Sequence, residues 1–221
     1  RFDRETETFH RYKHDSDDPQ SISGNWVYSL YEDSFGTLWA GTAGWGLNRF
    51  DPVTETFTSY VDYSSGLGAV SSIYEDRTGR FWIGCYKAGL HLFDRASGTW
   101  QTYTDDDGLP HRSVKAMLED DAGRLWLSTD NGLSRFDSEA GTFRNYSQAD
   151  GLQSNLFNLG AACRGRNGDL YFGGVYGFNA FHPDELQDND YPPQVVFSDL
   201  KLFNKSLEVT PESPLEAHVS V

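Results

Sequence analysis

Leu125-Trp126-Leu127-Ser128-Thr129 is one of four related segments that decide the fold of this chain. The other three are Leu38-Trp39-Ala40-Gly41-Thr42, Phe81-Trp82-Ile83-Gly84-Cys85 and Leu170-Tyr171-Phe172-Gly173-Gly174. Their central tryptophan, or the tyrosine that replaces it, returns after 43, 44 and then 45 residues. A period of this length predicts a stacked or radial array, because one such unit cannot bury its own apolar faces.

Each unit is predicted to contain four short strands. The first strands begin near Val27, Val70, Val114 and Leu159, and each of the first three ends in a turn with Asp first and Gly fourth. These two residue types suit a type I turn, since the carboxylate accepts turn N–H groups and Gly tolerates the exit geometry. The tryptophan strand, a glycine-bearing hairpin and a third strand follow. The fourth strand carries two aromatic residues three positions apart, as in Phe57/Tyr60, Trp100/Tyr103 and Phe143/Tyr146.

This pattern predicts an all-β fold, and specifically a portion of a β-propeller with about four four-stranded blades. A β-solenoid is the alternative, although its coils are usually shorter and less aromatic. We expect the strands that begin near Val27, Val70, Val114 and Leu159 to be innermost in their blades, because successive strands pair as neighbours. No helix longer than two turns is expected within residues 20–180. Trp39, Trp82 and Trp126 are expected to fill the wedges between neighbouring blades.

The repeat covers about residues 1–183. We expect residues 1–186 to form the propeller, and residues 187–221 to be a linker and the opening strands of a β-sandwich domain. Arg1-Phe2-Asp3 corresponds to Arg49-Phe50-Asp51, the end of a third strand. The fourth unit lacks its aromatic fourth strand. The chain is therefore expected to be a piece of a longer protein, or a ring that borrows the missing strand from residues 8–12.

Composition excludes several classes of function. The formal net charge of −15 over 221 residues argues against nucleic-acid binding, which needs clustered Lys and Arg. No stretch approaches the ~20 apolar residues of a membrane span. Cys85 and Cys163 fall in the second and fourth units, too far apart for a disulfide. Both are expected to be free and buried.

Catalytic and metal-binding motifs find little support. Asp105-Asp106-Asp107-Gly108 lacks the distal Glu of a calcium loop, so a solvated turn between blades is favoured. The six histidines show no paired ligand spacing. Neither a phosphate-binding loop nor a Gly-x-Ser-x-Gly elbow occurs. We expect no catalytic residue, no metal and no cofactor.

Positions that vary between units are more informative. In a propeller, the loops that enter the innermost strands share one face with the hairpins between second and third strands. On that face aromatic side chains stand beside polar ones, which suits a carbohydrate or another small polar ligand. The alternative is that these aromatic side chains simply cap the blades. The candidate ligand contacts are Trp26, Trp45, Tyr86, Lys87, Arg112, Asn131, Asn155 and Tyr176.

The repeat closely resembles the two-component regulator propeller repeat. The resemblance rests on Gly108-Leu109-Pro110, Ile73-Tyr74-Glu75-Asp76, Gly123-Arg124-Leu125-Trp126 and Gly132-Leu133-Ser134-Arg135-Phe136-Asp137. The fourth unit departs from it, with Arg164-Gly165 in place of Glu-Asp and Tyr171-Phe172 in place of Trp-Ile, and resembles a last blade. Residues 191–204, after the stiff Pro192-Pro193 junction, resemble the opening strand of a triple-tyrosine β-sandwich domain.

The resemblance implies a membrane-anchored sensor. In such proteins the propeller lies outside the cytoplasmic membrane, in the periplasm, and the sandwich passes the signal to a histidine kinase or a nucleotide cyclase. Many members respond to oligosaccharides. The resemblance therefore implies a non-enzymatic sensing domain for an oligosaccharide, with a homodimer through the sandwich and contact with the inner membrane only through other parts of the protein. A protein-interaction scaffold and a carbohydrate-active enzyme on a propeller fold remain the alternatives.

Overall fold

A computed structural model describes residues 1–60, 68–186, 201–202 and 205–206. Contacts divide the chain into two compact units, Arg1–Leu186 and Gln187–Val221. In the second unit, the described strands β18 (Lys201–Leu202) and β19 (Lys205–Ser206) pair antiparallel. Most of the segment that resembles the triple-tyrosine sandwich lies outside the described residues, so that assignment stays a prediction.

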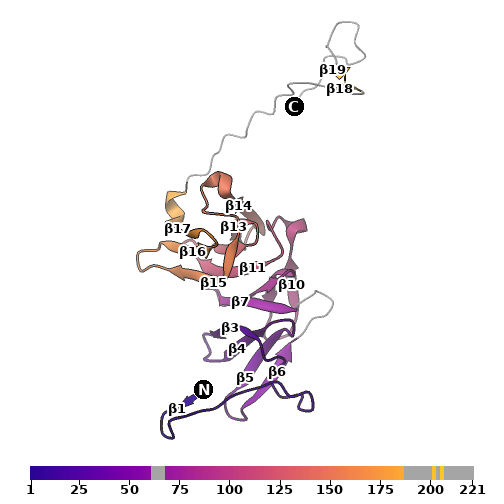
Figure 1. Ribbon diagram of the computed structural model, residues 1–221, viewed down its shortest axis with the longest axis vertical. Coiled ribbons are helices and arrows are strands. Elements are labelled where there is room, and N and C mark those ends of the chain that lie inside the picture. The colour runs from indigo at the N-terminus through magenta and orange to yellow at the C-terminus, as the bar shows by residue number, and fades with distance from the viewer. Residues whose placement is uncertain (61–67, 187–200, 203–204, 207–221) are drawn as a thin grey trace. The chain divides into compact units, whose positions relative to one another are not determined.

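The first unit is built from consecutive antiparallel sheets (Figure 1). The first complete blade is β3 (Val27–Glu32), β4 (Leu38–Thr42), β5 (Leu47–Asp51) and β6 (Thr56–Tyr60). The second is β7 (Ala69–Glu75), β8 (Phe81–Tyr86), β9 (Gly89–Phe93) and β10 (Trp100–Tyr103). The third is β11 (Val114–Glu119), β12 (Leu125–Thr129), β13 (Gly132–Asp137) and β14 (Thr142–Tyr146), and the fourth has β15 (Phe157–Arg164), β16 (Leu170–Gly174) and β17 (Gly177–Phe181).

The strand order confirms the propeller prediction. Within each blade the strands pair in chain order, and β3 contacts β7, β7 contacts β11, and β11 contacts β15. The first strand of every blade is therefore innermost, and β6, β10 and β14 are outermost. In the described part of the first unit the helical segments are three single turns of 3-10 helix, η1 (Asp105–Asp107), η2 (Gln148–Asp150) and η3 (Pro183–Glu185).

The recurring tryptophans lie between blades, as predicted. Trp126 is fully buried and packs on Phe157, Leu170 and Phe172 of the fourth blade. Trp82 packs in the same way on the third blade, and Trp39 on the second. The small residue two positions after each tryptophan allows the next blade to approach. A Cβ added to Gly41 would lie 2.7 Å from the Val70 carbonyl oxygen, closer than real side chains come.

One end of the blades, which we call the turn end, is held by a buried aspartate in each of the three complete blades. The Oδ2 atoms of Asp33, Asp76 and Asp120 accept the indole N–H of the tryptophan six residues later, at 2.8, 2.9 and 2.9 Å. Their Oδ1 atoms accept backbone N–H groups of the turn. Burial alone raises the pKa of Asp76, but hydrogen bonds from Thr78, Trp82 and Arg80 outweigh it and lower the pKa below its ordinary value.

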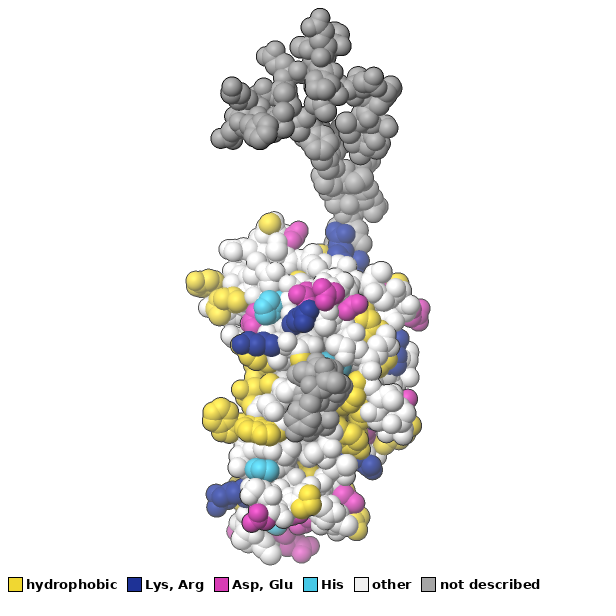
Figure 2. All heavy atoms as spheres, turned by 90° about the vertical axis from the view of Figure 1, so that its right-hand side faces the viewer, with side chains coloured by type: hydrophobic (Ala, Val, Ile, Leu, Met, Phe, Trp, Pro, Cys, Tyr) yellow, Lys and Arg dark blue, Asp and Glu magenta, His cyan; other side chains and the backbone are white. Residues whose placement is uncertain are grey.

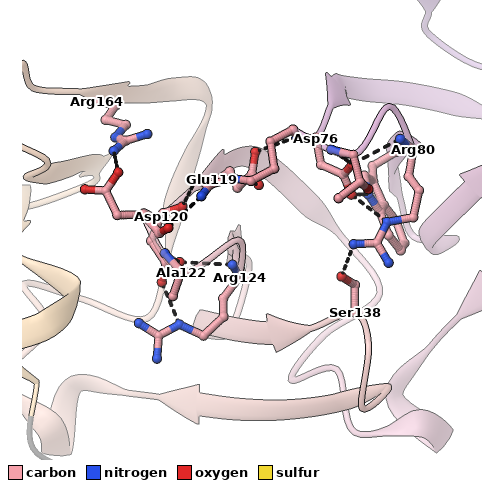
Figure 3. A network of polar contacts seen from close by, with 12 residues as sticks. Asp76, Arg80, Glu119, Asp120, Ala122, Arg124, Ser138 and Arg164 are labelled. Carbon is pink, nitrogen blue, oxygen red and sulfur yellow. Dashed lines mark hydrogen bonds and ion pairs between the residues drawn. The ribbon is translucent and has the colours of Figure 1, made fainter.

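An arginine balances each of these buried charges. Arg80 Nε donates to Asp76 at 2.8 Å, and Arg124 Nε donates to Asp120 at 2.8 Å (Figure 3). The first blade has Thr37 at the corresponding position, and its Asp33 is bound instead by Arg95 from the second blade at 3.0 Å. The same buried carboxylate therefore receives its counter-charge from a different element in different blades.

A second polar contact joins each blade to the next at the turn end. Glu75 accepts the N–H of Ser34 at 2.6 Å, and Glu119 accepts the N–H and Nε of Arg77 at 3.0 and 2.7 Å. At the junction with the fourth blade the charges are reversed, since Arg164 donates to Asp121 at 2.5 Å (Figure 3). The substitution of Arg164 for the usual Glu is thus matched by an acid on the preceding turn.

The first and fourth blades of the first unit each have a face that no other described blade covers. The short strands β1 (Phe2–Asp3) and β2 (Thr8–Phe9) pair with each other, so the proposed ring closure through residues 8–12 is wrong in this structure. Leu30 is 66% exposed, whereas Ile73 at the same place in the second blade is buried against Trp39. A hollow of about 450 Å³ lies on this open face of the first blade, lined in part by Val27, Leu30 and Leu38. Figure 2 shows hydrophobic side chains exposed at several places on the face that it draws, with acidic and basic side chains between them.

Candidate functional site

The other end of the blades, which we call the hairpin end, is built from two kinds of loop. Hairpins between second and third strands meet the loop that enters the next blade. Gly46 N–H donates to the Gly68 carbonyl at 3.0 Å, Gly89 to Arg112 at 2.7 Å, and Gly132 to Asn155 at 2.7 Å. This backbone contact recurs at each junction, so it fixes the loops while leaving their side chains free to differ.

The eight predicted contact residues all belong to these loops. Trp26 is 70% exposed, Trp45 49%, Tyr86 41% and Tyr176 81%. Lys87, Arg112 and Asn131 are also exposed, and Asn155 is half-buried. Trp45 uses part of its ring against Gly24, where an added Cβ would lie 2.6 Å from Trp45 Cε3. Trp26 and Tyr176 are the more open aromatic side chains.

The first two hairpins are joined through one strand end. Ala43 forms an isolated bridge with Ala69, and Ala69 pairs with Tyr86. Two strand spacings therefore separate the hairpin of Trp45 from that of Tyr86, about 10 Å between their backbones. The structure thus brings the Trp45 and Tyr86 loops onto one stretch of the rim.

Charged side chains are concentrated at the junction between the second and third blades. Lys87 Nζ lies 5.2 Å and Lys115 Nζ 4.8 Å from the centre of the Tyr86 ring. Lys115 also pairs with Asp130 at 3.0 Å. Arg112 is held by Asp105 and, at 3.2 Å, by Asp106. Sequence reasoning missed Lys115, which reaches the ring because it is the bulged residue of β11.

The junction between the third and fourth blades is different. Asn155 Nδ2 donates to Asn131 Oδ1 at 3.3 Å, and Asn131 Nδ2 donates to the Pro110 carbonyl at 3.3 Å. Asn155 Oδ1 accepts the Gln148 N–H at 2.7 Å. Most of the hydrogen bonds that these two amides form therefore connect the loops to one another. The two amides are thus less available for a ligand than the groups around Tyr86.

Comparison with known proteins identifies the repeats. Residues 21–44, 65–87 and 108–131 match the family described as two component regulator propeller. These three segments are two-component regulator propeller repeats. Each runs from the entry loop of a blade through its Asp turn and tryptophan strand into the hairpin.

The chain is similar to parts of larger proteins. A 102-residue stretch, 46% of this chain and 7% of the relative, is 32% identical to Histidine kinase P4 of Formosa agariphila. The extracellular domain of the hybrid two-component system BT3049 of B. thetaiotaomicron is 27% identical, with a TM-score of 0.70 over 80% of this chain and 24% of that one. The corresponding domain of BT4673 from the same organism is 22% identical, with a TM-score of 0.66 over 78% and 25%, and supports the fold alone. This chain therefore spans a small part of each relative.

The larger hollows described in the structure lie away from the hairpin end of these propeller repeats. One of about 450 Å³ and one of about 330 Å³ adjoin Phe35 and Arg95 at the turn end. Arg95 stacks over Phe35 at 5.1 Å and binds Asp33 and Glu75. Its guanidinium is thus already satisfied by the contact between blades, so the hairpin end remains the candidate for a ligand.

Residues suited to chemistry are used structurally in these propeller repeats. Asp107 closes a capping box with Thr104 in the turn η1, and Gly108 ends that turn in the left-handed region. Within the described ranges, no group of three His, Cys, Asp or Glu side chains is placed to hold a metal ion. In those same ranges no helix is long and apolar enough to cross a membrane.

The two cysteines differ in exposure. Cys85 is buried, which raises the pKa of its thiol, but Cys163 is exposed, so the expectation that both are buried is wrong for Cys163. Cys163 lies on β15, the innermost strand of the fourth blade, and no other blade among the described residues covers it.

Proposed function

We propose that this chain is part of the ligand-sensing propeller of a two-component signalling receptor, lying outside the cytoplasmic membrane, and that it does no chemistry on its ligand. The match of three repeats to the two-component regulator propeller family is the observation that carries this proposal. The similarity to an extracellular domain of a hybrid two-component system supports it. A kinase or cyclase output, and a homodimer through the second unit, belong to the same proposal.

The ligand we propose is an oligosaccharide bound at the hairpin end. Exposed aromatic rings offer flat faces for sugar rings, and neighbouring polar groups can hydrogen-bond to hydroxyls. Trp26, Trp45 and Tyr86 supply such faces, and Lys87 and Arg112 supply donors. The hairpins of Trp45 and Tyr86 are joined through Ala69, a separation that an extended ligand of a few sugar units can bridge.

A ligand screen tests this proposal directly. Thermal-shift screening of oligosaccharides against the complete ectodomain, with calorimetry on the hits, should find a ligand whose affinity falls in Trp45→Ala and Tyr86→Ala. Phe35→Ala is the control, because Phe35 is also an exposed aromatic side chain, 80% exposed, but lies at the turn end. Wild-type affinity in both hairpin-end variants would remove this surface from consideration. Chromatography of the bound sugar should recover it unchanged, and turnover would contradict the non-enzymatic assignment.

A further inference from the structure

Lysine is scarce in this propeller, and its distribution is uneven. Residues 1–186 contain three lysines, Lys13, Lys87 and Lys115, in a chain whose formal net charge is −15. Two of the three place their ammonium groups within 5.2 Å of the centre of one ring, that of Tyr86. Cation–π attraction holds each ammonium near the ring face. The two lysines also repel each other, so their convergence needs a reason.

The backbone at Lys87 is held in an unfavourable conformation. Lys87 has a φ of 66°, in the left-handed region, where residues with a Cβ are uncommon. The first blade has a hairpin of the same length, and its corresponding residue, Gly44, has a φ of 94°. Glycine adopts this conformation without strain. Strained backbone of this kind clusters at functional sites, so a lysine here points to a use for its side chain.

Lys115 reaches the same ring from the next blade. The pairing of β11 with β12 shifts register between Val114 and Ala116, so Lys115 is the bulged residue of its strand. Bulges are frequent beside binding sites because they re-aim a side chain. The corresponding bulge in the second blade presents Ser71, whose hydroxyl donates to the Gly84 and Val114 carbonyls inside the blade junction. In the third blade the bulge instead directs the ammonium group of Lys115 to the hairpin end.

The positive charges of this junction are not equally neutralised. Asp130 lies 3.0 Å from Lys115, and Asp105 and Asp106 bind Arg112. Among residues 1–60 and 68–186, no carboxylate lies within ion-pair distance of Lys87, whose backbone N–H is bound by Ser113 Oγ at 3.2 Å. The ammonium of Lys87 is exposed and restrained by the Tyr86 ring, and no carboxylate of the described residues is paired with it.

We propose that the hairpin end between the second and third blades binds an anionic group of the ligand, a carboxylate or a sulfate carried by a sugar. Lys87 is the main contact, Lys115 reinforces its charge, and Tyr86 orients both ammonium groups and offers its remaining surface to the sugar. This inference rests on the proposed function and narrows the ligand to acidic oligosaccharides. Both candidate groups present oxygens that accept hydrogen bonds from ammonium, and the experiment separates them.

Titrations followed by ¹H–¹⁵N NMR on the chain test the inference. The probes are digalacturonate, sodium sulfate and the neutral disaccharide lactose, at a constant ionic strength set with chloride. Amide signals of residues 86–88 and 113–116 should shift and saturate with digalacturonate, with sulfate, or with both. Saturation with digalacturonate alone identifies a uronate site, and saturation with sulfate assigns the site to sulfated sugars. If neither anion shifts these amides beyond the effect of chloride, the inference is wrong.

Substitutions of the lysines make the test specific. Lys87→Gly should weaken anion binding about tenfold, because a hydrogen bond to a charged group is worth about 1.5–3 kcal/mol. It should fold with an equal or higher melting temperature, since glycine relieves the backbone strain. Lys13→Gln is the matched control and should bind like wild type. Unchanged affinity in Lys87→Gly, or an equal loss in Lys13→Gln, would overturn the inference. If a neutral oligosaccharide binds the hairpin end and Lys87→Gly binds it as wild type does, the proposed function stands and this inference fails.

Discussion

The two ends of each blade use polar residues in opposite ways. At the turn end, a buried aspartate, a tryptophan N–H and an arginine recur in every complete blade and satisfy one another. At the hairpin end, the backbone contact between blades recurs but the side chains change from blade to blade. One end therefore holds neighbouring blades together and the other can vary without loss of the fold. This division is how a repeated scaffold presents a specific surface.

The largest expected difference between the two ends concerns tryptophan. Trp126→Ala should lower the free energy of unfolding by about 3–5 kcal/mol, because it empties a fully buried wedge between the third and fourth blades. Trp45→Ala at the hairpin end should cost less than about 1 kcal/mol, since half of that side chain is already in water. Urea denaturation measures both, and similar losses would contradict the division between the two ends.

The aspartates should show the same difference on a smaller scale. Asp120→Ala leaves the N–H groups of Ala122, Arg124 and Trp126 without their acceptor and should cost about 2–3 kcal/mol. Asp130→Ala removes one partly exposed ion pair at the hairpin end and should cost less than about 1 kcal/mol. A larger loss in Asp130→Ala, measured by the same denaturation, would mean that the hairpin end also holds the blades together.

Double-mutant cycles compare the usual ion pair between neighbouring blades with the pair of reversed charge at the last junction. The coupling between Arg77 and Glu119 should be about 1.5 kcal/mol, because Glu119 is buried and its bond to Arg77 is charge-assisted. The coupling between Asp121 and Arg164 should be below about 0.5 kcal/mol, since both side chains are substantially exposed. Equal coupling energies would show that burial is not what separates the regular junction from the last one.

The smallest expected effect is the loss of thermal stability at acid pH. Burial raises the pKa of Asp33, but hydrogen bonds from Trp39, Thr37 and Phe35 outweigh it and lower the pKa below its ordinary value of 3.8. A carboxyl whose pKa is lower in the folded state stabilises the protein above its unfolded pKa, and this contribution disappears as pH falls through the folded pKa. The melting temperature should therefore be nearly constant between about pH 7 and 5 and fall below about pH 4.

Asp33→Asn isolates the contribution of one carboxyl to this fall. The variant should be less stable at neutral pH but lose less melting temperature on acidification, because asparagine does not titrate in this range. Calorimetry from pH 7 to 2.5 compares the two proteins. Parallel curves for wild type and variant would show that Asp33 does not contribute to the acid response.

Much of this molecule follows from its sequence alone. The period of the tryptophan segments, the Asp–Gly turns and the aromatic fourth strands predict blades, their strand order and the buried wedge, because each signal is local and repeats in register. The loops of the hairpin end also follow, since chain direction places entry loops and hairpins together. Exposure on the open faces was harder to predict: Cys163 is exposed, whereas Tyr74 and Leu118 at the same position of the second and third blades are partly buried.

The tertiary structure alone decided which side chains from different blades meet. Arg95 of the second blade binds Asp33 of the first, in the role that Arg80 and Arg124 fill within their own blades. Lys115 reaches Tyr86 through a bulge that no residue pattern marks. A repeat determines its own strands because they pair across a few residues. Contacts between repeats depend on where a bulge or a turn directs a long side chain, and only the packed blades set that direction.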